Sequence, residues 1–188
     1  MGRKWKALII WIIVPYVFDT FVLFAIEAVF SQSVTLADWR RWTFDTRHLL
    51  AALLWCTAQG GIGTLILWML PVRRFWIGIM AGASLAIAYV VIVARIMMAF
   101  FGGFEENIDI FVGSFDLLLP SCWAGAYAGF LRFKDRQMQE ALEPEESSQD
   151  GAVELPQPEP RYIVSMTIFL FVLTGIWLAI LGRLRTWW

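Results

Sequence analysis

The sequence contains few charged residues, two cysteines and a single histidine. Only 16% of its 188 residues are charged, whereas 59% are hydrophobic and the mean hydropathy is +0.64. A soluble domain is usually about a quarter charged and about half apolar or less, so this composition argues against one. The formal net charge of −1 also argues against a nucleic-acid partner, because binding to a phosphate backbone needs a strongly basic surface.

The scarcity of ligating side chains bears on cofactors. His48 is the only histidine, so the chain cannot supply two axial histidines to a haem. Cys56 and Cys122 lie in separate apolar runs without the spacing of a metal site, and we interpret both as small buried side chains. The sequence also lacks the HExxH, GxSxG and phosphate-loop motifs. We therefore predict no metal and no cofactor, and the missing motifs argue against an enzyme.

The hydrophobic residues form long runs, each sufficient to cross a bilayer. About 20 apolar residues in a helix span the hydrocarbon core at 1.5 Å per residue. The runs lack the alternation of barrel strands, and a helix satisfies its own backbone hydrogen bonds in lipid. The predicted fold is an all-α integral membrane protein with a bundle of about five transmembrane helices. The predicted spans cover residues 7–30, 48–70, 75–101, 110–131 and 162–181.

Two polar segments separate some of these spans. Residues 31–48 combine arginines with Trp39, Trp42 and Phe44, a mixture that predicts a short segment lying in the membrane interface after the first span. Residues 137–160 are rich in Glu, Pro, Ser and Gln and lack aromatics, so they cannot bury enough apolar area to offset chain entropy. The predicted organisation is a four-helix membrane region (1–136), an acidic flexible connector (137–160), and a fifth helix with a short tail (161–188).

The Lys and Arg residues predict an orientation in the plasma (inner) membrane. Cytoplasmic loops of membrane proteins carry an excess of these residues. With a cytoplasmic N-terminus, nine basic residues share that side: Arg3, Lys4, Lys6, Arg73, Arg74, Arg132, Lys134, Arg136 and Arg161. Five lie on the opposite side with the C-terminus: Arg40, Arg41, Arg47, Arg183 and Arg185. We therefore predict a cytoplasmic N-terminus.

Ionisable and amide side chains inside the spans are the candidate functional residues, because such groups are costly in lipid and often mark a solute or ion pathway. Counting along each span places most of them at a similar depth in the outer half of the membrane, with Tyr89 slightly deeper. The candidate binding residues are Asp19, Glu27, Gln59, Tyr89, Arg95 and Asp116. Asp19 is the strongest functional candidate, because its short side chain cannot reach water from its depth.

Arg95 and Asp116 are placed symmetrically about the predicted turn between the third and fourth spans. Each is about six residues from that turn and therefore roughly 9 Å below the same surface. An ion pair across the hairpin is geometrically available and would relieve the cost of each charge. The pair can fix the helix register or take part in solute binding, and the sequence leaves both interpretations open.

Small residues predict close helix packing. Gly78 and Gly82 are four residues apart in the third span, and Gly125 and Gly129 are four apart in the fourth. This spacing lets helix backbones approach closely in a membrane. The second span contains QGGIG, residues 59–63, which favours close packing over the discontinuous helix found in some transporters.

Three functions fit these features. The first is a small transport component that binds or conducts a small solute or ion through the outer polar cluster. The second is a non-catalytic accessory subunit of a larger membrane complex, which associates with other subunits or with itself through small-residue faces. The third is an intramembrane lipid-modifying enzyme, which needs two carboxylates such as Asp19 and Asp116 within reach of a shared water or metal.

Overall fold

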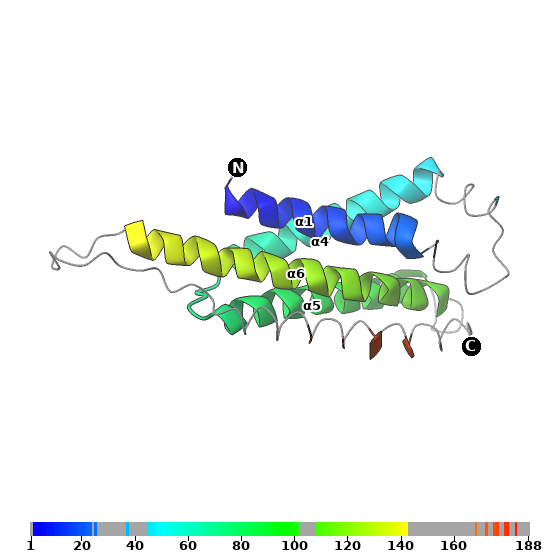
Figure 1. Ribbon diagram of the computed structural model, residues 1–188. Helices are drawn as coiled ribbons and strands as arrows, with labels where there is room; N and C mark the ends of the chain where they lie inside the picture. The colour runs from blue at the N-terminus through cyan, green and yellow to red at the C-terminus, as the bar shows by residue number, and fades with distance from the viewer. Residues whose placement is uncertain are drawn as a thin grey trace, which may run out of the picture.

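The computed structural model describes residues 2–23, 45–101 and 108–142, together with a few single positions outside these ranges. Its elements, in chain order, are α1 (Arg3–Val17), η1 (Phe18–Leu23), α4 (Thr46–Met69), α5 (Phe75–Phe101) and α6 (Ile108–Leu142) (Figure 1). Element η1 is a short π-helix that continues α1. Every regular element among the described residues is helical, which confirms the predicted all-α class for this part of the chain.

Several sequence predictions fall on other residues. Glu27, most of the predicted fifth span, the turn between the third and fourth spans, and most of the interfacial segment lie outside the described residues. The same holds for the predicted connector from residue 143 onward. These predictions stand as they were derived from the sequence.

Proline sets the shape of the first helix. Pro15 lies inside α1, where it has no N–H to donate to the Trp11 carbonyl. The helix nevertheless continues, and the N–H of Phe18 reaches the carbonyls of both Val14 and Pro15. Directly afterwards the chain adopts the wider π turns of η1, a local distortion that occurs often at functional sites.

A tight turn joins α4 to α5. Pro71 ends α4 because it cannot continue the helical hydrogen bonds. The N–H of Val72 instead donates to the Leu70 carbonyl at 2.9 Å, and the N–H of Gly78 donates to Arg74 at 3.2 Å. Helix α4 is continuous through its three glycines, and Gly60 and Gly63 pack against α1. The interpretation of QGGIG as a packing feature is therefore correct.

The last described helix is longer than the predicted fourth span. Helix α6 continues beyond Leu131 to Leu142 and includes the first residues of the predicted connector. Its extension is polar, and Arg136 Nε donates to Glu140 Oε1 at 2.6 Å across one helical turn. Pairs at this spacing support an exposed helix, which accounts for the continuation.

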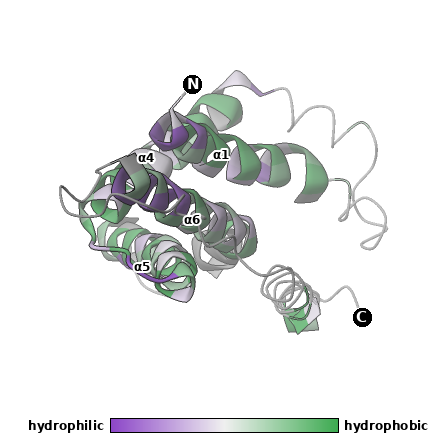
Figure 2. Cartoon of the chain, turned by 60° about the vertical axis from the view of Figure 1, so that its left-hand side comes forward, coloured by the Kyte–Doolittle hydropathy of each residue, from purple (hydrophilic) through white to green (hydrophobic). Residues whose placement is uncertain are grey.

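Within the described ranges, three helical stretches are long and apolar enough to cross a membrane: Arg3–Val22, Leu49–Met69 and Phe75–Ile96. Only 22–33% of the residues in these stretches are buried, so most of their apolar side chains face outward. Such surfaces are suited to lipid, and Figure 2 shows hydrophobic residues along much of the helices, with hydrophilic residues concentrated in the parts of α1 and α6 near the N-terminus. Among the described residues three helices thus have the length and composition of a span, and the predicted count of five is not confirmed.

The described helices form an antiparallel bundle. Near one end, Arg3 Nη1 of α1 lies 3.2 Å from the Met138 sulfur of α6, and Arg132 Nη2 donates to the Leu70 carbonyl at 3.3 Å. The start of α1, the α4–α5 turn and the polar end of α6 therefore meet at the same end. This basic end carries eight of the nine residues that the sequence analysis assigned to one side: Arg3, Lys4, Lys6, Arg73, Arg74, Arg132, Lys134 and Arg136.

Glycine contacts hold α5 against α6, the most extensive helix pair of the bundle. A Cβ on Gly78 would lie 2.6 Å from the Gly129 carbonyl oxygen, and a Cβ on Gly82 would overlap the Gly125 carbonyl. The two backbones are therefore in direct contact along the predicted small-residue faces. The small-residue face of α5 therefore packs against the small-residue face of α6 within this chain.

Trp11 joins the other helices to this pair. Its side chain is fully buried, and a Cβ on Gly63 of α4 would lie 2.6 Å from the indole. A Cβ on Gly125 of α6 would lie 3.1 Å from the same ring. The indole thus fills the space where α1, α4 and α6 meet, and it forms a core with Ala7, Leu67, Ala86, Ala124, Ala128 and Leu131.

Replacement of Gly82 by alanine tests this packing. Because the added methyl overlaps the Gly125 backbone, Gly82→Ala is expected to lower the free energy of unfolding by about 1–3 kcal/mol. The matched control is Gly61→Ala, whose added methyl meets no atom within 4 Å. The control is expected to raise stability by roughly 0.5–1 kcal/mol, as alanine generally does in a helix. Equal stability of the two variants in denaturant titrations of the detergent-solubilised protein would contradict the packing described.

Candidate functional site

The candidate functional site is a group of buried polar side chains, one helical turn away from Trp11. Pro15 follows Trp11 by four residues on α1, Gln59 precedes Gly63 by four on α4, and Ser121 precedes Gly125 by four on α6. Residues four apart lie on the same face of a helix, one turn from each other. Helices α4 and α6 run antiparallel to α1. Moving from Trp11 to Pro15, from Gly63 to Gln59 and from Gly125 to Ser121 is therefore a move in the same direction along the bundle, away from the end that carries Arg3. Pro15, Gln59 and Ser121 therefore share a level at the meeting faces of the three helices.

Polar side chains at this level and the next are buried and lack protein partners. Gln59 is 1% exposed, and Thr20 and Ser121 are fully buried. Neither amide atom of Gln59, nor the hydroxyl of Thr20 or Ser121, has a hydrogen-bond partner among the described residues. Hydroxyls in membrane helices commonly bond to the carbonyl one turn back, but these two do not. We call Thr20, Gln59 and Ser121 the polar core.

These unmade hydrogen bonds are energetically significant. A buried polar group without a partner costs about 1–3 kcal/mol. The polar core contains both donors and acceptors, because the Gln59 amide supplies each kind and hydroxyls can do either. In native proteins, buried groups of this kind are generally satisfied by water, an ion or a ligand. The polar core therefore offers hydrogen-bond donors and acceptors on η1, α4 and α6.

Two prolines interrupt the helical hydrogen bonding around the polar core, although both helices continue through them. Pro15 lies at the level of Gln59, and Pro120 directly precedes Ser121 in α6. Each proline lacks an N–H, so the carbonyl four residues earlier cannot accept the usual helical hydrogen bond. In transmembrane helices such carbonyls are tolerated where neighbouring helices, hydroxyls or water satisfy them. The prolines thus leave the carbonyls of Trp11 and Asp116 without their usual helical donors, one turn to either side of the level of Gln59.

Predicted site residues occupy the next turn. Asp19 lies in η1, close enough to Cys56 of α4 to interact with it electrostatically, and Cys56 is likewise close to Tyr89 of α5. The Tyr89 ring contacts Trp55 edge-to-face, with ring centroids 6.2 Å apart. Asp19, Tyr89 and the predicted Gln59 therefore occur on neighbouring turns of three different helices.

The remaining predicted residues are placed differently. Arg95 is exposed on α5. Asp116 belongs to α6, with its side chain outside the described part of the structure, so its ion pair with Arg95 stays a prediction. Thr20 and Ser121 were missed by the sequence analysis, because hydroxyl residues are common in membrane helices and rarely stand out. The signal that could have found Ser121 is its position after Pro120, where the helical backbone is already incomplete.

No cluster of three or more His, Cys, Asp or Glu residues able to hold a metal ion occurs in the described ranges. The groups that the polar core offers are an amide, hydroxyls and, one turn away, a carboxylate. Such groups bind neutral hydrogen-bonding molecules, water or a cation.

Comparisons with known proteins provide no assignment. No protein-family model, curated protein or solved structure matches this chain.

Replacement of Gln59 by leucine tests whether its amide is needed by the bundle. Because the amide atoms have no protein partner, Gln59→Leu is expected to leave the free energy of unfolding unchanged or raise it by about 1–3 kcal/mol. Denaturant titration of the detergent-solubilised protein measures the change. Thr57→Val, on the exposed face of the same helix, is the control and should shift stability by less than about 0.5 kcal/mol. A loss above roughly 2 kcal/mol in Gln59→Leu alone would mean that the amide stabilises the fold.

Proposed function

We propose that this chain is a membrane transport component whose helical bundle binds or conducts a small polar solute or cation through the polar core and the adjacent Asp19. The observation that carries the proposal is the fully buried Gln59, whose amide has no partner among the described residues. An amide in that position costs stability unless something outside the described chain occupies it.

The surrounding structure supports this use of the polar core. The helices that contribute it are joined by close contacts with the Trp11 indole, so its groups are held by packed helices rather than by loops. The prolines and the π-helix next to it resemble the irregular helices that line solute sites in transporters. Arg95 is not included, because its exposed side chain is not part of this arrangement.

The chemistry of the side chains limits the solutes. Amide and hydroxyl groups fit a neutral molecule with both donors and acceptors, such as a small amide or polyol. Asp19 adds an acceptor of negative charge and would favour a cation over an anion. The proposal therefore excludes anionic solutes as the preferred substrates.

The orientation is part of the proposal. The basic end of the bundle is assigned to the cytoplasm of a cell bounded by an inner membrane, since loops rich in Lys and Arg stay on that side. With that assignment the N-terminus is cytoplasmic and the polar core lies on the outer side of Trp11. The concentration of eight basic residues at one end of the described bundle supports this choice.

Reconstitution of the full chain into liposomes tests the proposal. The probes are urea and glycerol, followed by light scattering after an osmotic shift, and potassium and protons, followed by fluorescent dyes. At least one probe is expected to cross faster than in empty liposomes. Gln59→Leu should slow that probe by about tenfold, the factor expected for loss of one hydrogen bond worth roughly 1.4 kcal/mol.

Two variants sharpen this test. Thr57→Val, on the exposed face of α4, should transport as the unchanged protein does. Asp19→Asn should slow a cation but not urea, because it removes the charge and retains an acceptor. If none of the four probes crosses faster than in empty liposomes, or if Gln59→Leu and Thr57→Val behave alike, the transport proposal is wrong.

A further inference from the structure

A second polar site lies at the basic end, well separated from the polar core. A cavity of about 160 Å³ opens there beside α6 and is lined by Arg132, Arg136, Gln139 and Glu140. These residues recur at the spacing of one helical face. The volume is several times the roughly 30 Å³ that one water molecule occupies in the liquid, so the cavity has room for a tetrahedral anion.

Arg132 is held in place for binding. Its Nη2 donates to the Leu70 carbonyl at 3.3 Å, and its guanidinium lies over the Trp68 ring, 5.9 Å from the ring centroid. Its Nε is buried, so the donors available to a ligand are those of the two Nη atoms. These carry four N–H groups in a planar fork, of which one is used by the Leu70 carbonyl, so a fixed Arg132 still presents donors that match the oxygens of a phosphate.

The charge of the cavity selects the ligand. Arg132 and Arg136 contribute two positive charges, and Glu140, which pairs with Arg136 at 2.6 Å, contributes one negative charge. The lining is therefore singly positive and complements a phosphate diester, which carries one negative charge. The other basic residues at this end would attract an anion and repel the cationic part of a zwitterionic headgroup.

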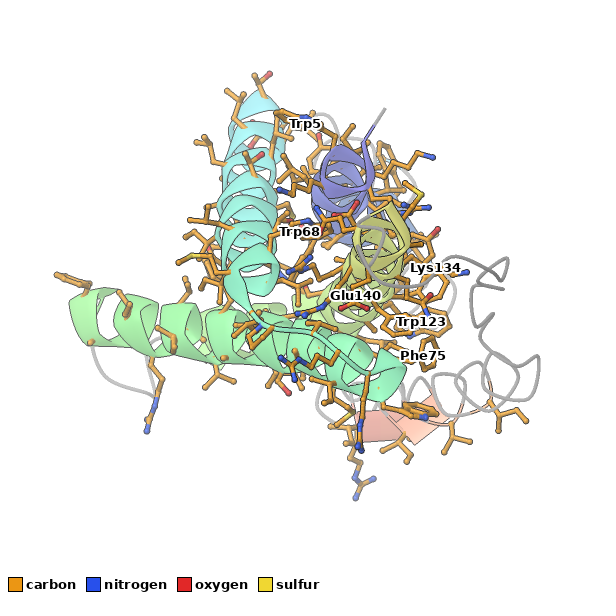
Figure 3. The ribbon with its side chains drawn as sticks, turned by 90° about the vertical axis from the view of Figure 1, so that its left-hand side faces the viewer. Trp5, Trp68, Phe75, Trp123, Lys134 and Glu140 are labelled. Atoms are coloured by element: carbon orange, nitrogen blue, oxygen red, sulfur yellow. The ribbon has the colours of Figure 1, made fainter. Side chains whose placement is uncertain are left out.

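The position of the cavity indicates where the phosphate comes from. The cavity residue Arg132 contacts the end of α4, and Trp68, Phe75 and Trp76 flank the turn that follows. Tryptophan and other aromatic residues collect at the level of lipid headgroups. In Figure 3, which looks onto this end, Trp68 and Lys134 lie on opposite sides of α6. Arg132 is on the side toward α4, because its guanidinium lies over the Trp68 ring, and Lys134 is not among the residues that line the cavity.

We propose that this cavity binds a singly charged phosphate group supplied by the headgroup of an anionic phospholipid in the leaflet at the basic end. The site uses residues separate from the polar core, and its role is independent of whether the protein transports a solute. A lipid held by Arg132 would bridge the end of α4 and the extension of α6 that the apolar spans do not cover.

The test uses the full chain in a neutral detergent and measures ligand binding by native mass spectrometry and thermal stabilisation. Phosphatidylglycerol is expected to bind at least about tenfold more tightly than phosphatidylcholine, and Arg132→Gln should remove that preference, because a charged hydrogen bond contributes about 1.5–3 kcal/mol. Lys134→Gln is the matched control: it removes one charge from the same helix outside the cavity and should retain the preference.

Glu140→Gln keeps the test informative if Arg132→Gln fails to fold. It removes the negative charge from the lining and should tighten binding of phosphatidylglycerol by several-fold. Inorganic phosphate provides the other arm: competition by it at millimolar concentration supports the phosphate site but assigns a soluble source. Equal losses in Lys134→Gln and Arg132→Gln, or no effect of Glu140→Gln, would overturn the proposal, since binding would then reflect diffuse charge alone.

Discussion

Direct contact between glycine backbones is the constraint on which the rest of the bundle depends. In lipid, helices gain little from burying apolar surface, so they are held by close van der Waals packing. Gly82 and Gly125 provide that contact between α5 and α6. Trp11 then fills the space left beside Gly125 and Gly63 and brings α1 and α4 to the same point. Because of these contacts, Pro15, Gln59 and Ser121, each one turn from Trp11 or from a glycine beside it, lie at the same height along the bundle.

Tight packing also keeps the side chains of the polar core away from bulk water. In a loose bundle, an amide such as that of Gln59 could reach water or a neighbouring helix. Here Gln59 lies one turn from Trp11, at the faces where three helices meet, and it is almost fully buried. The packing therefore holds the amide at a buried position where no described residue is its hydrogen-bond partner. The accessory-subunit alternative relied partly on exposed glycine faces, and in this chain α5 and α6 cover those faces for each other.

Much of the fold was predictable because apolar length and small-residue spacing act locally. The spans over α4 and α5, the end at Pro71 and the close packing of QGGIG all follow from such patterns. The extension of α6 to Leu142 was missed, because its polar composition also fits a loop and only the Arg136–Glu140 pair shows its helical support. Gln59 was predicted from its depth, whereas Thr20 and Ser121 became evident only when burial and missing partners could be seen.

The most direct test of the central claim is an experimental structure of the full chain in lipid at a resolution that shows ordered water. The account predicts density next to Gln59 that belongs to no protein atom and lies at hydrogen-bond distance from its amide, about 2.7–3.2 Å. Density of the same kind should reach the Ser121 hydroxyl. A Gln59 amide bonded only to protein groups, or turned outward into the acyl chains, would contradict it.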